Sequence, residues 1–167
     1  MPREVYGGPN GQLYFRPVAE ALAQFNHVIL SSATDSALTA LSTSIPTPEN
    51  YLVECDVQLE QGAELAVAMR EDDADKQSGY RLILNPGKGE AEITSSRFSH
   101  PRKVDIDWTK PVKIQAFVQG SIIECFIQDE YAFSCRAYGY RRGNLKMEVT
   151  KGDAKVVDLV VRTLGGL

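Results

Sequence analysis

The sequence has few of the residues that most often carry catalytic or metal chemistry. Its 167 residues include only two histidines, three cysteines and one tryptophan. The cysteines, Cys55, Cys125 and Cys135, are odd in number and form no Cys-x-x-Cys pair, which argues against a zinc knuckle and a complete disulfide framework. We therefore expect buried free thiols, at most one intramolecular disulfide, and neither a metal nor a cofactor.

Long apolar runs and basic clusters are also missing. Apolar stretches such as 156–160 and 122–127 are short and interrupted by Asp158 and Glu124, whereas a membrane span needs ~20 residues. Eighteen Lys and Arg against 22 Asp and Glu give a formal net charge of −4, and the basic residues are scattered along the chain. We expect neither a membrane nor a nucleic acid as a partner.

What is present is the composition of one soluble globular domain, with 43% hydrophobic and 24% charged residues. The first twenty residues carry four charged side chains and lack the apolar core of a secretory signal peptide. The compartment stays open at this stage, because a cytoplasmic parent chain and a secreted one are both compatible with this sequence.

Alternation of apolar and polar side chains, the pattern of half-buried strands, dominates from residue 51 onward. In residues 51–59 the odd positions are apolar, whereas Glu54, Asp56 and Gln58 are polar. After intervening turn residues, the pattern recurs in 65–69, 80–84, 112–118, 122–128, 132–138, 144–150 and 155–163. Many short strands joined by turns predict an all-β fold, an antiparallel two-sheet β-sandwich of the concanavalin or jelly-roll kind.

The first fifty residues have a different pattern. Residues 17–25 place a proline at a helix start and apolar residues at helical spacing, which predicts a short helix. Residues 42–50 are rich in Ser, Thr and Pro and predict a loop. We therefore divide the chain into a linker segment with a short helix, 1–30, and a β-sandwich domain, 31–167.

Catalytic and metal chemistry find little support. His27 follows the predicted helix and His100 lies in a predicted polar loop, without the spacing of a triad or a metal site, so a surface or packing role is favoured for both. The acidic segment 71–75 is typical of a solvated turn. Calcium is the alternative there, but the segment lacks the register of an EF-hand loop.

Two further residues allow a structural and a functional interpretation. Glu54 is expected to point away from the core, either as an ordinary exposed acid or as part of a polar site on the sheet surface. Trp108 precedes a strand, where it either covers the core or stacks on a ligand such as a sugar ring.

Two separated stretches resemble parts of a known family. Residues 2–5 (PREV) and 11–18 (GQLYFRPV), followed by Glu20, resemble the segment through which glycoside hydrolase family 32 enzymes pass from a catalytic propeller into a C-terminal β-sandwich. Residues 121–130 (SIIECFIQDE) and 133–138 (FSCRAY) resemble a hairpin of that sandwich. The family includes invertases, levanases, inulinases and sucrose-6-phosphate hydrolases.

Residues 79–82 and Trp108 fit the same plan, so the resemblance spans nearly the whole chain. The family's catalytic acids lie on the propeller, in Asn-Asp-Pro-Asn-Gly, Arg-Asp-Pro and Glu-Cys motifs. The first two motifs are absent here, and Glu54-Cys55 lies on a predicted sandwich strand, so no catalytic role is carried over to Glu54. The resemblance implies that this chain has no catalytic residues of its own, whereas the parent acts on β-fructosides.

The chain also resembles the fructan-binding modules of carbohydrate-binding module family 66, which hold a terminal fructose with acidic and Arg side chains. This resemblance implies sugar-binding roles for Glu54, Arg70 and Asp72, with Trp108 as a candidate ring. Arg and carboxylate side chains suit vicinal hydroxyls, because one donates and the other accepts hydrogen bonds. A surface ion pair explains Arg70 equally well.

Three hypotheses follow. The first is a non-catalytic C-terminal sandwich that packs on and stabilises a propeller, with residues 17–25 supplying part of the interface. The second is an autonomous fructan- or carbohydrate-binding module. The third, an enzyme in its own right, is the weakest because no nucleophile, base and orienting group can be placed together. A homo-oligomer formed through a sheet edge or through the exposed propeller-facing surface is a further partner hypothesis.

Overall fold

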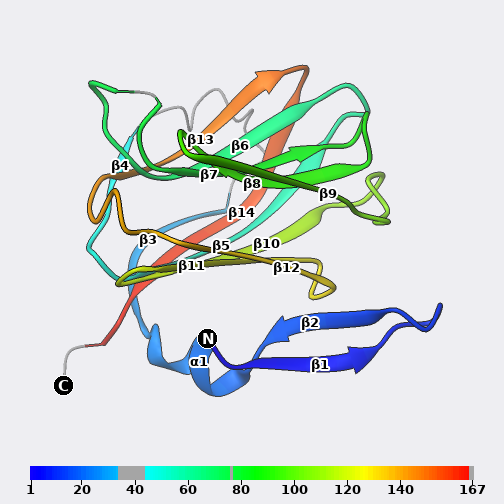
Figure 1. Cartoon of the computed structure of the whole chain (residues 1–167), viewed down its shortest axis with the longest axis horizontal. Helices are drawn as coiled ribbons and strands as arrows, with labels where there is room; N and C mark the ends of the chain where they lie inside the picture. Colours follow the sequence, from blue (N-terminus) through cyan, green and yellow to red (C-terminus); the bar gives the residue numbers. More distant parts are fainter. Residues whose placement is uncertain (34–43, 76, 166–167) are drawn as a thin grey trace.

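A computed structural model of the chain describes residues 1–33, 44–75 and 77–165. It contains two stacked antiparallel sheets and a separate hairpin (Figure 1). The elements are β1 (Arg3–Gly7), β2 (Leu13–Pro17), α1 (Ala19–Gln24), β3 (His27–Ala33), β4 (Ile45–Pro46), β5 (Tyr51–Leu59), β6 (Glu64–Glu71), β7 (Tyr80–Asn85), β8 (Glu90–Ser95), β9 (Phe98–Lys103), β10 (Val112–Gln119), β11 (Ile122–Ile127), β12 (Tyr131–Arg136), β13 (Asn144–Lys151) and β14 (Ala154–Thr163).

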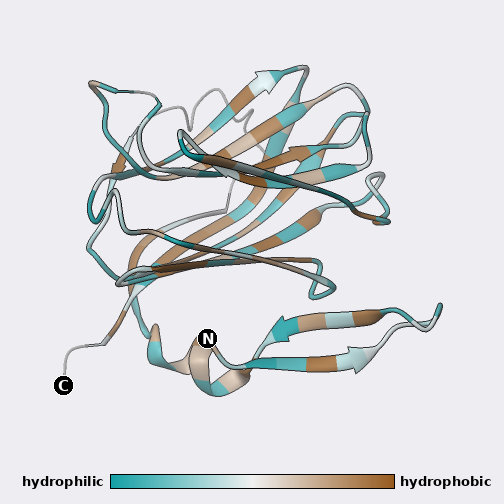
Figure 2. Cartoon of the chain, in the orientation of Figure 1, coloured by the Kyte–Doolittle hydropathy of each residue, from teal (hydrophilic) through white to brown (hydrophobic). Residues whose placement is uncertain are grey.

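The predicted all-β sandwich is confirmed. One sheet, the β5 sheet, has the order β12-β11-β10-β5-β14-β3, and the other, the β6 sheet, has the order β4-β13-β6-β7-β8-β9. Apolar side chains at alternate strand positions fill the space between the two sheets. In β5, for example, Val53, Cys55 and Val57 are almost fully buried in the inter-sheet core. Hydrophobic segments accordingly recur along the strands of both layers (Figure 2). The core is therefore the set of alternate residues that the sequence marks as apolar.

One irregularity in β6 breaks the alternation. The pairing of β13 with β6 jumps from Asn144–Glu71 to Lys146–Ala68, so Met69 and Arg70 together face a single residue of β13. This arrangement is a β-bulge, and Arg70 has a φ of 58°, in the left-handed region. The bulge turns Arg70 inward, and it is only 1% exposed, although alternation places it on the outer face.

The N-terminal segment covers part of the outer face of the β5 sheet (Figure 1). A second apolar cluster forms there from Phe25, Leu52, Phe117 and Phe126, with Leu22 and other N-terminal side chains packed against it. The rings of Phe25 and Phe126 both meet Phe117 edge-on, at centroid distances of 5.6 and 6.0 Å. The apolar side of the 17–25 segment is thus packed within this chain, and an interface role for its exposed residues stays a prediction.

The structure refines several sequence predictions. The predicted helix is confirmed but is shorter, from Ala19 to Gln24. Residues 99–103, predicted as a polar loop around His100, instead belong to β9 at the edge of the β6 sheet. Pro101 is tolerated there because an edge strand leaves amides unpaired. β3 continues across the division between 30 and 31 and pairs with β14. Within the described ranges, no helix has the length and hydropathy to cross a membrane.

Candidate functional site

The structure separates the four residues that the sequence singled out for sugar binding. Glu54 lies in the β5 sheet, with its carboxylate on the outer face, whereas Arg70 lies in β6 and Asp72 in the exposed loop that follows. The Asp72 carboxylate accepts a hydrogen bond from the backbone N–H of Ala74, at 2.9 Å. Trp108 is half-buried and packs against the inter-sheet core. Their roles in sugar binding stay predictions.

Arg70 uses its guanidinium inside the protein. Nη1 donates to the backbone carbonyl of Tyr140 at 3.1 Å, and Nη2 donates to those of Glu49 and Gly120 at 3.0 and 2.7 Å. Burial lowers the pKa of the guanidinium, because removal from water disfavours the charged form. Gly143 fits against this bulge because a Cβ at its position would collide with the Arg70 backbone. The geometry is that of a structural clamp joining the two sheets.

Glu54 belongs to a shallow polar hollow on the outer face of the β5 sheet. Its carboxylate pairs with Arg162 at 3.1 Å and accepts a hydrogen bond from the Gln115 amide at 3.1 Å. Asp56 and Asp158 line the same hollow, whose volume is about 190 Å³. Burial and the nearby Asp158 carboxylate raise the pKa of Asp56. Glu54 therefore lies among other polar side chains on the sheet surface, and Arg70 does not line this hollow.

We expect Glu54→Ala to lower the free energy of unfolding by about 1 kcal/mol. The lost pair with Arg162 is partly exposed and contributes little, but the buried Gln115 amide loses its acceptor. Urea denaturation of the variant measures the change. Glu148→Ala, a half-buried carboxylate with no ion pair among the described residues, is the control, and a loss above 3 kcal/mol for Glu54→Ala would place it in a structural network.

Other candidates for chemistry do not assemble into a site. His100 lies in β9 with its ring stacked on Phe98 at 5.1 Å, and His27 is exposed at the start of β3. All three cysteines are free thiols, and burial raises the pKa of both Cys55 and Cys125. Over residues 1–33, 44–75 and 77–165, no three His, Cys, Asp or Glu side chains lie close enough to hold a metal ion.

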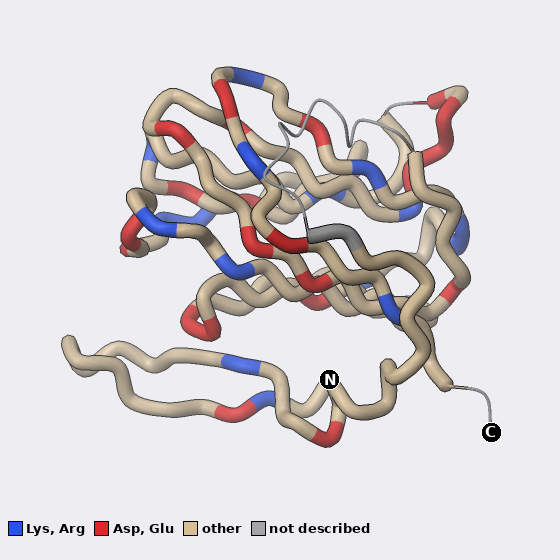
Figure 3. Tube along the Cα trace, turned by 180° about the vertical axis from the view of Figure 1, so that it is seen from behind, with Lys and Arg blue, Asp and Glu red and all other residues tan. Residues whose placement is uncertain are grey.

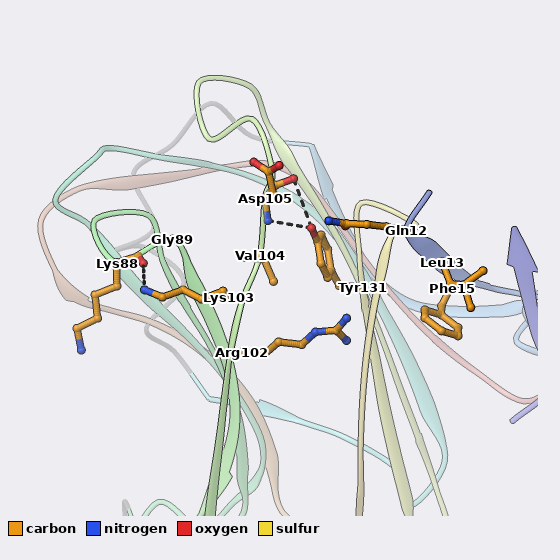
Figure 4. A pocket seen from close by; sticks show the side chains of 10 residues that line it. All are labelled: Gln12, Leu13, Phe15, Lys88, Gly89, Arg102, Lys103, Val104, Asp105 and Tyr131. Carbon is orange, nitrogen blue, oxygen red and sulfur yellow. Dashed lines mark hydrogen bonds between the residues drawn. The ribbon is translucent and has the colours of Figure 1, made fainter. Parts of the chain in front are cut away.

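A broad concavity lies between the tip of the β1–β2 hairpin and the edge of the sandwich (Figure 4). We call it the hairpin groove; its volume is about 710 Å³. The groove forms because two hydrogen bonds hold the hairpin to the β11–β12 turn. The Tyr6 hydroxyl donates to the backbone carbonyl of Asp129 at 2.7 Å, and the Phe15 N–H donates to the backbone carbonyl of Glu130 at 3.1 Å. The groove is lined by Gln12, Leu13, Phe15, Lys88, Gly89, Arg102, Lys103, Val104, Asp105 and Tyr131.

The two walls of the groove differ in chemistry. The hairpin contributes the apolar side chains of Leu13 and Phe15, and the sandwich contributes three basic residues and Asp105. Arg102 lies over the Tyr131 ring, 5.3 Å from its centroid, and has no carboxylate partner among the described residues. The Tyr131 hydroxyl accepts a hydrogen bond from the Asp105 N–H at 2.8 Å, which fixes the ring (Figure 4). The groove can bind an apolar and acidic segment or a polar ligand.

Sequence reasoning missed the groove because its walls lie far apart in the chain. The basic residues Lys88, Arg102 and Lys103 are scattered along the sequence, and acidic and basic residues remain interspersed over the molecule as a whole (Figure 3). Only the strand order brings the end of β9 next to the hairpin. The one local signal available was the adjacent basic pair Arg102-Lys103, and strand alternation does not indicate what such a pair faces.

Comparison with known proteins identifies the fold. No protein-family model matches the sequence, and no curated protein sequence is significantly similar to it. Among solved structures, exo-inulinase from Aspergillus awamori superimposes with a TM-score of 0.79 and 16% identity, over 99% of this chain and 35% of that chain. Fructan 1-exohydrolase IIa from Cichorium intybus superimposes with a TM-score of 0.72 and 14% identity, over 99% of this chain and 40% of that chain. Carbohydrate-binding module CBM66 from Bacillus subtilis superimposes with a TM-score of 0.56 and 11% identity, over 97% of this chain and 92% of that chain.

These identities are low, so the shared property is the fold. The chain spans about a third of the length of the exo-inulinase and nearly the whole of the carbohydrate-binding module. The resemblance expected from the sequence is thereby confirmed at the level of architecture: the chain has the β-sandwich fold of the C-terminal module of family 32 glycoside hydrolases, shared with CBM66.

Proposed function

We propose that this chain is a non-catalytic β-sandwich module that packs against the catalytic propeller of a family 32-like glycoside hydrolase acting on β-fructosides. The proposal rests on the apolar face of the hairpin, where Val5 is 55% and Leu13 is 62% exposed. Val5 is the cross-strand partner of Phe15, and Leu13 of Gly7, so the three apolar side chains share one face. An exposed apolar face bordered by charged residues is typical of an interface.

The groove beside this face suits a segment of a second domain. An apolar side chain of that segment would contact Leu13 and Phe15, and a carboxylate would reach the unpaired Arg102. The coverage of about a third of the exo-inulinase and fructan exohydrolase chains supports a partner domain of this kind. The resemblance places the family's catalytic acids on the propeller, and two of the three catalytic motifs are absent from this sequence, so the proposal assigns no catalytic residue to this chain.

We expect Leu13→Asp to reduce the binding of an uncharged apolar dye such as Nile red severalfold while leaving the free energy of unfolding within about 0.5 kcal/mol of the original, because the side chain is exposed in the isolated chain. Dye fluorescence and urea denaturation measure the two quantities. Val157→Asp, at an apolar residue 39% exposed on β14 of the sandwich, is the matched control. Equal dye binding by the original and Leu13→Asp would argue against the hairpin as the interface.

The second candidate is an autonomous carbohydrate-binding module, favoured by the match to nearly the whole of CBM66. In this case the groove would take sugar hydroxyls, with Arg102 as donor and Asp105 as acceptor. The sugar-binding roles implied for Glu54, Asp72 and Trp108 belong to the same candidate, as does a fructan or sucrose-type ligand.

Titration calorimetry with fructose, levan and inulin oligosaccharides separates the candidates. With sugar concentrations high enough to detect a Kd of about 1 mM, or about −4 kcal/mol, the packing module gives no saturable heat and releases no fructose. Saturable heat that disappears in Arg102→Ala would establish the binding module instead. Fructose release that survives repeated purification would overturn both, since it requires catalytic residues in this chain.

A further inference from the structure

A second cavity lies at the opposite end of β9 from the hairpin groove. It is formed where the chain leaves β12 and passes to the other sheet, beside the β8–β9 turn. Its volume is about 150 Å³, the space of about five water molecules at ~30 Å³ each. We call it the arginine–tyrosine pocket; it is lined by Tyr80, Ser95, Arg97, Phe98, Arg136, Tyr138, Gly139 and Tyr140.

The aromatic wall of this pocket is rigid on one side and exposed on the other. Tyr80 is 4% exposed, its ring meets those of Phe98 and Tyr140 at 6.3 and 6.0 Å, and its hydroxyl accepts the Gly139 N–H at 3.2 Å. Tyr138, by contrast, is 70% exposed. A buried ring held by neighbours forms a fixed floor, and an exposed ring at the rim offers a face on which a flat ligand can stack.

The charge of the pocket is entirely basic. Arg97 and Arg136 line it and no lining residue is acidic. The guanidinium carbon of Arg97 lies 3.9 Å from where a Cβ on Gly139 would be, so the side chain reaches over the pocket. Neither arginine has a carboxylate partner in the part of the chain that the structure describes.

Some other arginines form ion pairs with carboxylates, whereas Arg97 and Arg136, like Arg70 and Arg102, do not do so among the described residues. Arg16 pairs with Glu4, Arg162 with Glu54 and Arg81 with Glu71, in a chain whose net charge is −4. Because both arginines line one pocket that has no acidic lining residue, an anion that enters it meets two positive charges. Arginine binds carboxylate and phosphate groups through paired hydrogen bonds, and either group fits a volume of about five waters.

We propose that the arginine–tyrosine pocket binds a sugar that carries a phosphate or carboxylate group. The anionic group lies between Arg97 and Arg136, and the sugar ring stacks on Tyr138. The anion follows from the charge and size of the pocket; the choice of a sugar as the body of the ligand rests on the proposed carbohydrate-related function. The site is separate from the hairpin groove, because the two share no lining residue.

Titration calorimetry with fructose 6-phosphate, glucuronate, fructose and inorganic phosphate tests the proposal. We expect saturable binding of the two anionic sugars, at least tenfold weaker binding of inorganic phosphate, and no binding of fructose. A tenfold difference corresponds to about 1.4 kcal/mol. Raising the salt concentration should weaken binding of both anionic sugars, because the arginines are exposed.

Matched variants connect the binding to the pocket. Arg136→Gln should weaken fructose 6-phosphate binding at least tenfold, and Tyr138→Leu severalfold, with rescue by Tyr138→Phe, which keeps the ring. Arg142→Gln removes the same charge from an exposed position that does not line the pocket and should change nothing. All four substitutions are at exposed residues, so folding is expected to be retained, as circular dichroism can verify.

Three results would overturn the proposal: no binding of either anionic sugar, equal affinity for inorganic phosphate and fructose 6-phosphate, or an equal loss of affinity in Arg142→Gln and Arg136→Gln. The proposed packing function is tested by different measurements, so its failure can be distinguished from failure of this proposal. That function depends on Leu13 and is measured by dye binding and by fructose release, neither of which involves this pocket.

Discussion

Arg70→Met is expected to lower the free energy of unfolding by roughly 3–5 kcal/mol. Arg70 is 1% exposed and donates hydrogen bonds to three backbone carbonyls, those of Glu49, Gly120 and Tyr140. Methionine fills similar space but donates nothing, so three carbonyls lose their partner. Each buried unsatisfied polar group costs about 1–3 kcal/mol, and entry of water into the site would offset part of the sum.

The same clamp explains why the loss should be cooperative. Gly120 lies in the turn between β10 and β11 of the β5 sheet, whereas Arg70 itself is in the β6 sheet. The guanidinium therefore ties the two layers together at one end of the sandwich. Arg70→Lys keeps a positive charge but not the planar fork of donors, so we expect most of the loss to remain.

Urea denaturation followed by circular dichroism measures the effect. The melting temperature should fall by about 2–4 °C for each kcal/mol in a chain of this length. Arg142→Met, at an exposed arginine that follows Tyr140 closely in the sequence, is the control and should stay within about 0.5 kcal/mol. A small loss in Arg70→Met, comparable with that control, would show that the guanidinium is free for a ligand, as the sequence suggested.

Most of the fold could be predicted because it depends on alternation. The strands β5, β6, β7, β10 and β11 each carry apolar residues at alternate positions, and one partner layer buries that face. Alternation predicted the wrong structure at two places in the chain. The bulge at Met69 and Arg70 reverses the direction of one side chain, and β9 is an exposed edge strand whose sequence needs no apolar face.

The candidate sites were largely beyond sequence reasoning. Glu54 was correctly placed on the outer face of its strand, but its partners Arg162 and Gln115 come from neighbouring strands, which only the register specifies. Arg97 and Arg136 are likewise brought to one pocket by the crossing of the chain between sheets. Side chains that meet across long sequence separations leave no local pattern in the sequence. The scattered basic residues therefore gave no indication that two of them line one pocket.

Phe117→Ala is the second substitution for which we expect a large loss, about 3–5 kcal/mol. Phe117 is fully buried on the outer face of the β5 sheet, between the rings of Phe25 and Phe126. Removing its ring leaves a cavity beneath α1 and withdraws the contact that holds the N-terminal segment to the sandwich. Leu82→Ala, in the core between the sheets, should destabilise the chain to a similar extent.

Hydrogen exchange distinguishes the two variants, although their stabilities are similar. In Phe117→Ala the amides of α1 should exchange faster than those of β10, because the segment detaches while the sandwich stays folded. In Leu82→Ala both should accelerate together, through global unfolding. Equal acceleration in both variants would mean that the N-terminal segment and the sandwich unfold as one unit, so the cluster around Phe117 would not control the segment separately.

The expected difference bears directly on the proposed function. A docking face must be held in place before its partner arrives, because ordering it upon association costs binding free energy. The hairpin bearing Val5 and Leu13 contacts the sandwich at the β11–β12 turn, and is joined through α1 to the cluster around Phe117. If that cluster positions the hairpin, Phe117→Ala should release the N-terminal segment and expose Phe25, Leu52 and Phe126, so that binding of an uncharged apolar dye rises under native conditions, whereas Leu82→Ala should leave it unchanged.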